Sequence, residues 1–196
     1  YETKDFNEAL KAGALAGSES FKWGAITGAI SGGATEAIAL KGATLNGLTM
    51  NEAALIQKES GYPLDVIKEF QSMEQYNICK DAGIYPEMIN GKTALLREID
   101  LNQLDEVGRT NAQRISENLA PLDPEGIPYE LHHIGQHTDS TLAILTREEH
   151  RLGENYSIWH DTVESGTGVH AVLTEAQWAS QKQAFWKAYL AMFGGA

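Results

Sequence analysis

The stretch ELHHIGQ, residues 130–136, decides the fold, because it places two adjacent histidines at the end of a short strand-like run. Strand side chains alternate, so His132 and His133 point to opposite faces of a sheet. One imidazole can therefore face a metal ion while the other faces a substrate. His150 and His160 follow in a helical stretch. A catalytic metal site needs about three protein ligands and an open position, and His132, His150 and His160 supply that number.

Further motifs around this stretch give the chain a family resemblance. They are GRTN (108–111) and AP (120–121) upstream, then LTREEHR (145–151), WH (159–160) and FWK (185–187) downstream. Together with the histidine pair they resemble the LHH family of bacterial toxin nucleases, part of the HNH (His-Me finger) superfamily. The resemblance covers about residues 100–196.

The resemblance implies an α+β, mostly helical fold in two parts. Residues 1–100 would form a helical, glycine-rich pre-toxin region, and residues 101–196 a ββα-metal nuclease domain. The implied activity is that of a metal-dependent endonuclease, which hydrolyses phosphodiester bonds in the DNA of competitor bacteria. The resemblance also implies secretion as part of a larger toxin, action in the cytoplasm of the target bacterium, and a cognate immunity protein.

The resemblance assigns a role to each histidine of the motif. The first of the pair is a metal ligand in such enzymes, which puts His132 on the metal with His150 and His160. The second, His133, is the general base, and histidine is the side chain whose ordinary pKa, about 6.5, lies closest to neutrality. The central asparagine of the superfamily has no clear counterpart, and Thr141 is the expected stand-in.

The ligand types predict which metal is bound. The single cysteine, Cys79, offers no thiolate cluster, so nitrogen and oxygen must hold the ion. Three imidazoles suit zinc best, whereas magnesium prefers oxygen ligands. Zinc is therefore the predicted ion, with magnesium, manganese and nickel as alternatives.

The spacing of the downstream histidines leaves one question open. His150 and His160 are ten residues apart, so a break at Gly153 must bring His160 back to the site. Glu148 or Glu149 is the alternative ligand. We expect His137 to be a loop residue and His170 to lie outside the site.

The charge of the chain counts against a nuclease. Its formal net charge is −12, and proteins that bind nucleic acid by neutralising phosphates are basic at least locally. A metal ion can supply positive charge at the scissile phosphate. Local arginines can supply more, and the predicted substrate contacts are Arg109, Arg114, Arg147 and Arg151. We also expect an inhibitor to contact the area around Arg109, Arg147 and Arg151.

Two alternative functions stay open. One is an RNase on the same scaffold, in which the RNA 2′-hydroxyl attacks and leaves a cyclic phosphate. The other is a non-catalytic binding module with a structural zinc closed by four ligands, His132, His133, His150 and His160. Analysis of product ends separates the RNase from the DNase, and an open coordination position argues against the binding module.

The first third of the chain has a different composition. Glycines recur there mostly at spacings of four, at positions 13, 17, 24, 28 and 32. Such spacing allows close helix packing, and in a membrane it would mark a packing face. The longest uncharged stretch, residues 23–35, is too short to span a bilayer. Soluble packed helices are therefore favoured over membrane interaction. Because the chain begins at Tyr1 rather than methionine, it is expected to be a fragment.

Capping residues predict where several helices begin and end. Thr49 with Glu52 three residues later is a capping-box pattern. Asn118 suits a left-handed C-cap, and Thr174 is the expected cap of the last helix. The aromatic residues of that last helix are expected to pack in the core, and no catalytic group is expected in residues 1–95.

Overall fold

The computed structural model describes residues 44–160 and 172–195 of the 196-residue chain. It divides into two compact units, Tyr1–Tyr76 and Asn77–Ala196. The glycine-rich stretch 13–32 and His170 lie outside the described residues, so the helical packing and the membrane preference predicted for that stretch stay predictions. Within the described ranges, no helix has the length and apolar character needed to cross a membrane.

The first unit contains a short antiparallel pair and helices. The strands are β1 (Thr44–Leu45) and β2 (Leu48–Thr49), followed by α4 (Met50–Ser60), α5 (Leu64–Ile67) and the start of α6 (Met73–Asp81). The predicted capping box is present, because Thr49 Oγ1 accepts a hydrogen bond from Glu52 N–H and the Glu52 carboxylate accepts one from Thr49 N–H. The aromatic rings of Tyr62, Phe70 and Tyr76 pack in the core of this unit.

The second unit is built on a mixed four-stranded sheet. Its strands, β3 (Tyr85–Ile89), β4 (Lys92–Leu96), β5 (Glu130–His133) and β6 (Leu142–Leu145), are arranged in the order β3-β4-β6-β5. Adjacent strands are antiparallel except β4 and β6, which run parallel with Leu95 opposite Ala143. The described residues are therefore mixed α+β, and the expectation of a mostly helical chain is not confirmed.

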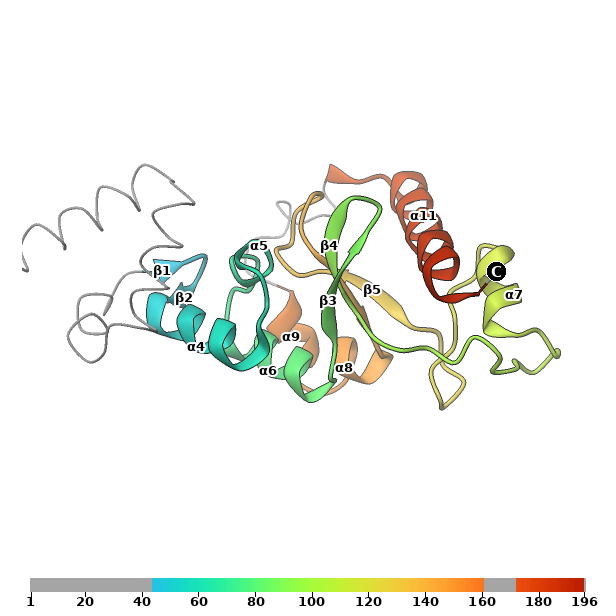
Figure 1. Cartoon of the computed structure of the whole chain (residues 1–196), viewed down its shortest axis with the longest axis horizontal. Coiled ribbons are helices and arrows are strands. Elements are labelled where there is room, and N and C mark those ends of the chain that lie inside the picture. Colours follow the sequence, from blue (N-terminus) through green and yellow to red (C-terminus); the bar gives the residue numbers. More distant parts are fainter. Residues whose placement is uncertain (1–43, 161–171, 196) are drawn as a thin grey trace, which may run out of the picture. The chain divides into compact units, whose positions relative to one another are not determined.

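Helices cover both faces of this sheet (Figure 1). The helices α7 (Asn111–Ser116) and α11 (Glu175–Phe193) lie on one side, and α8 (Arg147–Arg151) and α9 (Asn155–Trp159) lie on the other. The first face holds a hydrophobic core, whose buried members include Leu131, Ile144, Phe185, Trp186 and Tyr189. The aromatic residues Phe185, Trp186 and Tyr189 of α11 are thus core residues, as predicted. Trp178 is only partly buried, and Phe193 is exposed, so the prediction is wrong for Phe193.

Polar residues cap the helices of this unit at the positions that the sequence predicted. Thr174 accepts a hydrogen bond from Gln177 N–H at the start of α11. Asn118 follows α7 with φ +64°, the left-handed conformation expected of a C-cap asparagine. Asn111 in α7 is buried and bonds to the carbonyls of Asp100 and Leu122, so it fastens two loop segments to the helix.

The strands β3 and β4 precede residue 101 in sequence but belong to the same sheet as β5 and β6. The division between the two compact units falls after Tyr76, and the domain boundary predicted between residues 100 and 101 stays a prediction. The sheet pairing gives a physical reason to count the β3–β4 hairpin as part of the predicted nuclease domain, because Ala94, Leu95 and Leu96 of β4 are buried.

We predict that a fragment of residues 77–196 folds cooperatively and that a fragment of residues 101–196 does not. Removing β3 and β4 takes away the parallel partner of β6 and several buried apolar side chains, each of which contributes about 1.5–3 kcal/mol. That loss is comparable with the whole stability of a small domain, about 5–15 kcal/mol. Urea unfolding followed by circular dichroism measures both fragments. Equal midpoints for the two fragments would contradict this prediction.

Candidate metal centre

Three histidines from three elements meet on the α8–α9 side of the sheet. His132 lies on β5, His150 on α8, and His160 directly follows α9. The His132 ring centroid is 4.7 Å from that of His150 and 5.2 Å from that of His160, and His150 is 5.1 Å from His160. One ligand nitrogen from each lies within 4.8 Å of the others. Among the described residues, this group of histidine, cysteine and carboxylate side chains has the spacing to share one ion.

The chain returns to the site through the predicted break. Helix α8 ends at Arg151, Gly153 takes the left-handed conformation with φ +60°, and α9 then leads to His160. Trp159 anchors this return: it is fully buried, its Nε1–H donates to the Glu149 carbonyl at 2.9 Å, and its ring lies 4.8 Å from His132. The side-chain amide of Gln136 also donates to the Trp159 carbonyl.

A carboxylate orients the His150 ring. Glu130 Oε2 lies 2.5 Å from His150 Nδ1 and accepts a second hydrogen bond from Arg151 Nε at 2.7 Å. A carboxylate on one ring nitrogen fixes the tautomer and leaves the other nitrogen to bind metal. His150 Nε2 is buried and has no hydrogen-bond partner among the described residues. Such a buried nitrogen is suited to a metal ligand, because an unpaired buried polar atom is otherwise costly.

The protonation states at this corner also suit metal binding. Burial lowers the pKa of His150 from its ordinary value, although Glu130 opposes the shift. The imidazole is therefore neutral at neutral pH, as a metal ligand must be. Burial would raise the pKa of Glu130, but the hydrogen bonds from Arg151 and His150 outweigh it and lower the pKa. Glu130 is thus an ionised acceptor at neutral pH.

His160 is oriented by the backbone rather than by a carboxylate. Its Nδ1 lies 2.9 Å from the Tyr156 carbonyl oxygen, to which the protonated nitrogen donates. The Tyr156 ring stacks on the imidazole with centroids 4.4 Å apart. As at His150, the hydrogen bond at Nδ1 leaves Nε2 as the ligating atom.

His133 lies on the opposite face of β5, as the alternation of strand side chains predicted. Its ring is 4.7 Å from Trp178 of α11, and its Nε2 atom is buried. His133 is not a member of the group formed by His132, His150 and His160. The structure therefore does not form the four-histidine closed site of the binding-module alternative.

Thr141 braces the hairpin through its backbone. Its carbonyl accepts a hydrogen bond from Ile134 N–H at 3.0 Å, and the Ser140 hydroxyl accepts one from Gly135 N–H at 3.2 Å. Both residues are buried. The loop after His133 is thus closed at the place where the superfamily's asparagine was expected, and a catalytic role of the Thr141 side chain stays a prediction.

The alternative ligands Glu148 and Glu149 are not in the histidine group. Arg97 Nη2 donates to both carboxylate oxygens of Glu149, at 2.7 and 2.9 Å. The same carboxylate accepts a hydrogen bond from Thr146 N–H at the start of α8. Cys79 is buried, and burial raises the pKa of its thiol, with Glu149 adding to the shift. Cys79 is also not a member of the histidine group. His137 is exposed in the loop, as predicted.

Three of the four arginines predicted to contact substrate are held in ion pairs. Arg109 and Arg114 both bind Asp105 at 2.8 Å, and Arg114 has a side-chain exposure of only 11%. Arg151 binds Glu130. Arg147 is exposed on α8. Their roles as substrate contacts stay predictions, but their ion pairs reduce the positive charge they present to a phosphate.

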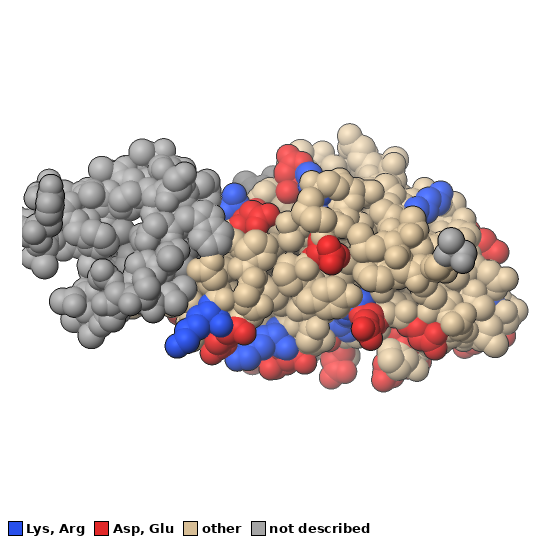
Figure 2. All heavy atoms as spheres, in the orientation of Figure 1, with Lys and Arg blue, Asp and Glu red and all other residues tan. Residues whose placement is uncertain are grey.

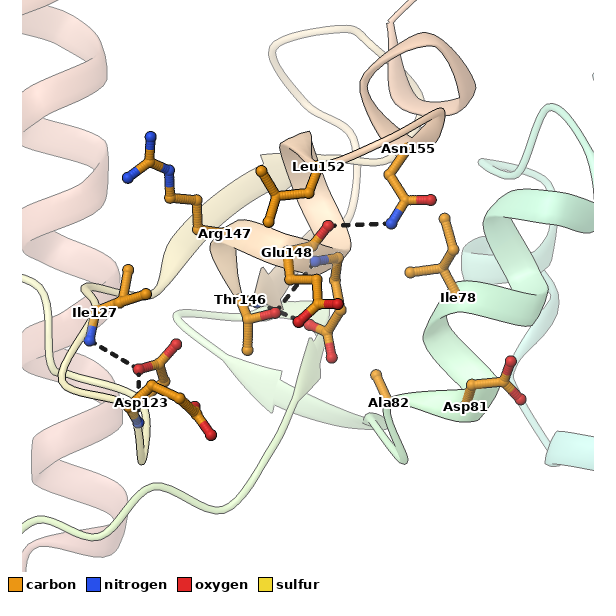
Figure 3. A pocket seen from close by; sticks show the side chains of 12 residues that line it. Ile78, Asp81, Ala82, Asp123, Ile127, Thr146, Arg147, Glu148, Leu152 and Asn155 are labelled. Atoms are coloured by element: carbon orange, nitrogen blue, oxygen red, sulfur yellow. Dashed lines mark hydrogen bonds between the residues drawn. The ribbon is translucent and has the colours of Figure 1, made fainter.

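A cavity of about 810 Å³ lies beside α8 and contains several carboxylates (Figure 3). None of the three clustered histidines lines it. One arginine, Arg147, lines the cavity. The acidic residues that line it are more numerous: Asp81, Asp123, Glu125, Glu148 and Glu149. On the face shown in Figure 2, acidic and basic side chains are interspersed without a continuous basic patch. Among its described residues, this face therefore has no broad basic surface that could neutralise the phosphates of a nucleic acid.

The sheet, the covering helices and the histidine group form one domain with a candidate metal centre. Residues 110–191 match the family model LHH, described as a nuclease of the HNH/ENDO VII superfamily with conserved LHH. The match identifies this segment as a nuclease, an enzyme that hydrolyses phosphodiester bonds of nucleic acid. Neither a curated protein nor a solved structure matches the chain at a significant level.

Sequence reasoning did not identify Glu130 as part of the site. The signal was present, because Glu130 stands two residues before His132 and residues two apart on a strand share a face. Arg97 was also missed, and it had no sequence signal. Its contact with Glu149 joins the end of β4 to α8 across fifty-two residues of sequence.

We predict that Glu130→Gln lowers metal affinity about 10–100-fold, the usual effect of removing the partner of a metal-binding histidine. The amide has the same size as the carboxylate. It carries no negative charge, so it no longer stabilises the proton on His150 Nδ1 as the ionised Glu130 does. Isothermal titration with zinc measures the change. The matched control is Glu148→Gln, an exposed carboxylate on α8 outside the histidine group. Loss of affinity in the control but not in Glu130→Gln would mean that Glu148 is the ligand.

Proposed function

We propose that the chain is the metal-dependent endonuclease domain of an antibacterial toxin that hydrolyses phosphodiester bonds in DNA. The observation that carries the proposal is the separation of the histidine pair on β5. His132 joins His150 and His160 on one face, while His133 lies on the other face beside α11. This arrangement provides a ligand set and a separate base within the LHH-family domain.

Each histidine has a part in the proposed hydrolysis. His132, His150 and His160 hold the ion, and the nitrogen donors favour zinc, with magnesium, manganese and nickel as alternatives. When bound, a divalent ion supplies a Lewis acid that stabilises charge on the phosphate and on the departing oxygen. His133 accepts the proton of the attacking water. Glu130 and the Tyr156 carbonyl hold two of the ligating rings in position.

The toxin role rests on the resemblance of the chain to LHH toxin nucleases. A nuclease of this kind would be secreted within a larger toxin, would act in the cytoplasm of a competing bacterium, and would require a cognate immunity protein in the producer. Helix α8 carries Arg147 and Arg151, two of the three arginines of the predicted inhibitor surface, together with the proposed ligand His150.

We predict that the purified chain degrades plasmid DNA with a divalent ion and that a chelator abolishes the activity. The expected rescue by added zinc, manganese, nickel or magnesium identifies the preferred ion. Gel electrophoresis with DNA and RNA substrates in parallel measures cleavage, and product-end analysis distinguishes water attack from a cyclic-phosphate route. Cleavage that persists in full after complete metal removal would refute the proposed mechanism.

We predict different effects for the base and for the ligands. His133→Ala should keep the bound metal and the fold while lowering turnover by roughly 10²–10⁴-fold, the usual contribution of general base catalysis. Alanine at 132, 150 or 160 should lower both metal content and melting temperature, because the ion binds the folded state. Metal analysis, melting curves and cleavage rates measure these effects.

The matched control for these variants is His137→Ala, since His137 is an exposed loop histidine of the same segment. It should retain metal, stability and turnover. In the bacterial cytoplasm the unaltered chain should arrest growth and His133→Ala should not. A His133→Ala protein that loses its metal, with a His160→Ala protein that keeps it, would reverse the assignment.

A further inference from the structure

The third member of the histidine group, His160, is the one that lies outside a helix or strand. His132 belongs to β5 and His150 to α8, whereas His160 follows the last residue of α9. Its backbone is extended, with φ −122° and ψ 119°, and it is half-buried where the other two histidines are buried. The position of His160 beside the other two rings therefore depends on contacts that hold the end of α9.

Two hydrogen bonds hold the peptide group that joins Trp159 to His160. The Trp159 carbonyl accepts a hydrogen bond from the side-chain amide of Gln136, and His160 N–H donates to the Tyr156 carbonyl at 3.0 Å. Because a peptide group is planar, partners on both of its sides fix its orientation. The Cα atom of His160 lies in that plane, so the same two contacts also set where the imidazole side chain begins.

Gln136 has a backbone conformation that is unusual for its side chain. Its φ is +60°, in the left-handed region, and the other non-glycine residues with positive φ among the described ones are Asn46, Asn90 and Asn118. Asparagine adopts this region more readily than glutamine does. Residues held in it at a cost in free energy cluster at functional sites. The presence of glutamine rather than glycine or asparagine therefore points to a role of the side chain.

The loop that contains Gln136 connects the strand of the histidine pair to the third histidine. Gln136 N–H donates to the His133 carbonyl at 3.1 Å, which closes a turn directly after β5. From this turn the side chain reaches the Trp159 carbonyl, which is 23 residues further along the chain. An asparagine amide would be one methylene group shorter, and glycine would have no side-chain donor. Neither of the residues that suit the left-handed backbone best would therefore reproduce this contact.

We propose that Gln136 is a positioning residue of the metal centre. Its side-chain amide holds the Trp159–His160 peptide so that His160 completes the ligand set with His132 and His150. The proposal rests on the ligand assignment of the proposed function. A ligand that is already in place when the ion arrives does not have to be ordered during binding, which favours affinity. Loss of a group that orients a metal-binding histidine usually lowers metal affinity about 10–100-fold.

The test measures the affinity of the full chain for Zn²⁺ by competition with a chromophoric chelator. Gln136→Met has a side chain of similar length without an N–H donor, and Gln136→Gly also relaxes the left-handed backbone. Both variants should bind Zn²⁺ about tenfold more weakly, at the lower end of the range for lost orienting groups. Metal-free Gln136→Gly should nevertheless melt at a higher temperature than metal-free Gln136→Met. If affinity instead followed stability, so that the glycine variant bound Zn²⁺ as tightly as the unaltered chain, the inference would be overturned.

Asn90→Gly is the matched control. Asn90 also has a left-handed backbone, with φ +51°, and its side-chain amide donates to the Ala184 carbonyl at 3.2 Å. It lies in the turn between β3 and β4 and is not a member of the histidine group. The substitution removes the same kind of hydrogen bond at the same kind of backbone position, so Zn²⁺ affinity should not change. An equal loss of affinity in this control would show a general effect of loosening the fold and would overturn the inference.

A double-mutant cycle tests whether Gln136 acts through His160. His160→Ala should lower Zn²⁺ affinity, and adding Gln136→Met should cause no further loss, because both changes then remove the same contribution. Losses that simply add would overturn the inference, as would a His160→Ala protein that retains full affinity. Coupled losses in a chain that cleaves no nucleic acid with any ion would support the inference and defeat the nuclease mechanism. Cleavage by a chain whose Gln136 variants bind Zn²⁺ as the unaltered chain does would leave the nuclease function intact and overturn the inference.

Discussion

The alternation of side chains along β5 is the constraint on which the rest of the site depends. Four residues, Glu130–His133, serve two faces of the sheet. Glu130 and His132 face α8 and α9, whereas Leu131 enters the hydrophobic core beneath α11 and His133 contacts α11. A one-residue slip in register would exchange these faces. The pairing of His132 with Ala143 and of His133 with Leu142 therefore fixes the chemistry as well as the sheet.

The α8 helix is held against this strand by polar contacts at both ends. At its start, Glu149 joins the Thr146 cap to Arg97, which follows β4. At its end, Arg151 and His150 share the Glu130 carboxylate. The side-chain exposures of Arg97 and Glu149 are 12% and 22%, so water screens this ion pair only in part. The hairpin β3–β4 precedes the LHH match at residues 110–191, yet through Arg97 it helps to place a histidine of that match.

Arginines in this domain organise the fold as much as they supply charge. Arg109 and Arg114 converge on Asp105, and burial, which would raise the pKa of Asp105, is outweighed by hydrogen bonds from both arginines that lower it. Arg114 also donates to the Ala120 carbonyl. These contacts fasten the loop before α7 to the turn after it. The positive charge of Arg109 in the motif GRTN is therefore balanced within the domain. For this reason the number of arginines in the sequence does not measure how well the domain can bind phosphate.

The sequence by itself determined the local features that depend on near neighbours. The cap residues Thr49 and Thr174, the left-handed Asn118, the break at Gly153 and the opposite orientation of His132 and His133 all follow from short-range sterics and hydrogen bonding, and the structure has each of them. The grouping of His132, His150 and His160 was also predictable, because the number and type of donors suggested it.

Only the tertiary structure decided which distant segments meet. The partnership of β4 with β6, the contact of Arg97 with Glu149, and the contact of Gln136 with Trp159 join residues far apart in sequence, for which no local pattern exists. The same holds for the arginines, whose pairing with Asp105, Glu117 and Glu130 could not be read from their spacing. Local conformation is set by each residue and its neighbours, whereas these contacts arise when the chain buries its apolar surface and must satisfy the polar groups brought in with it.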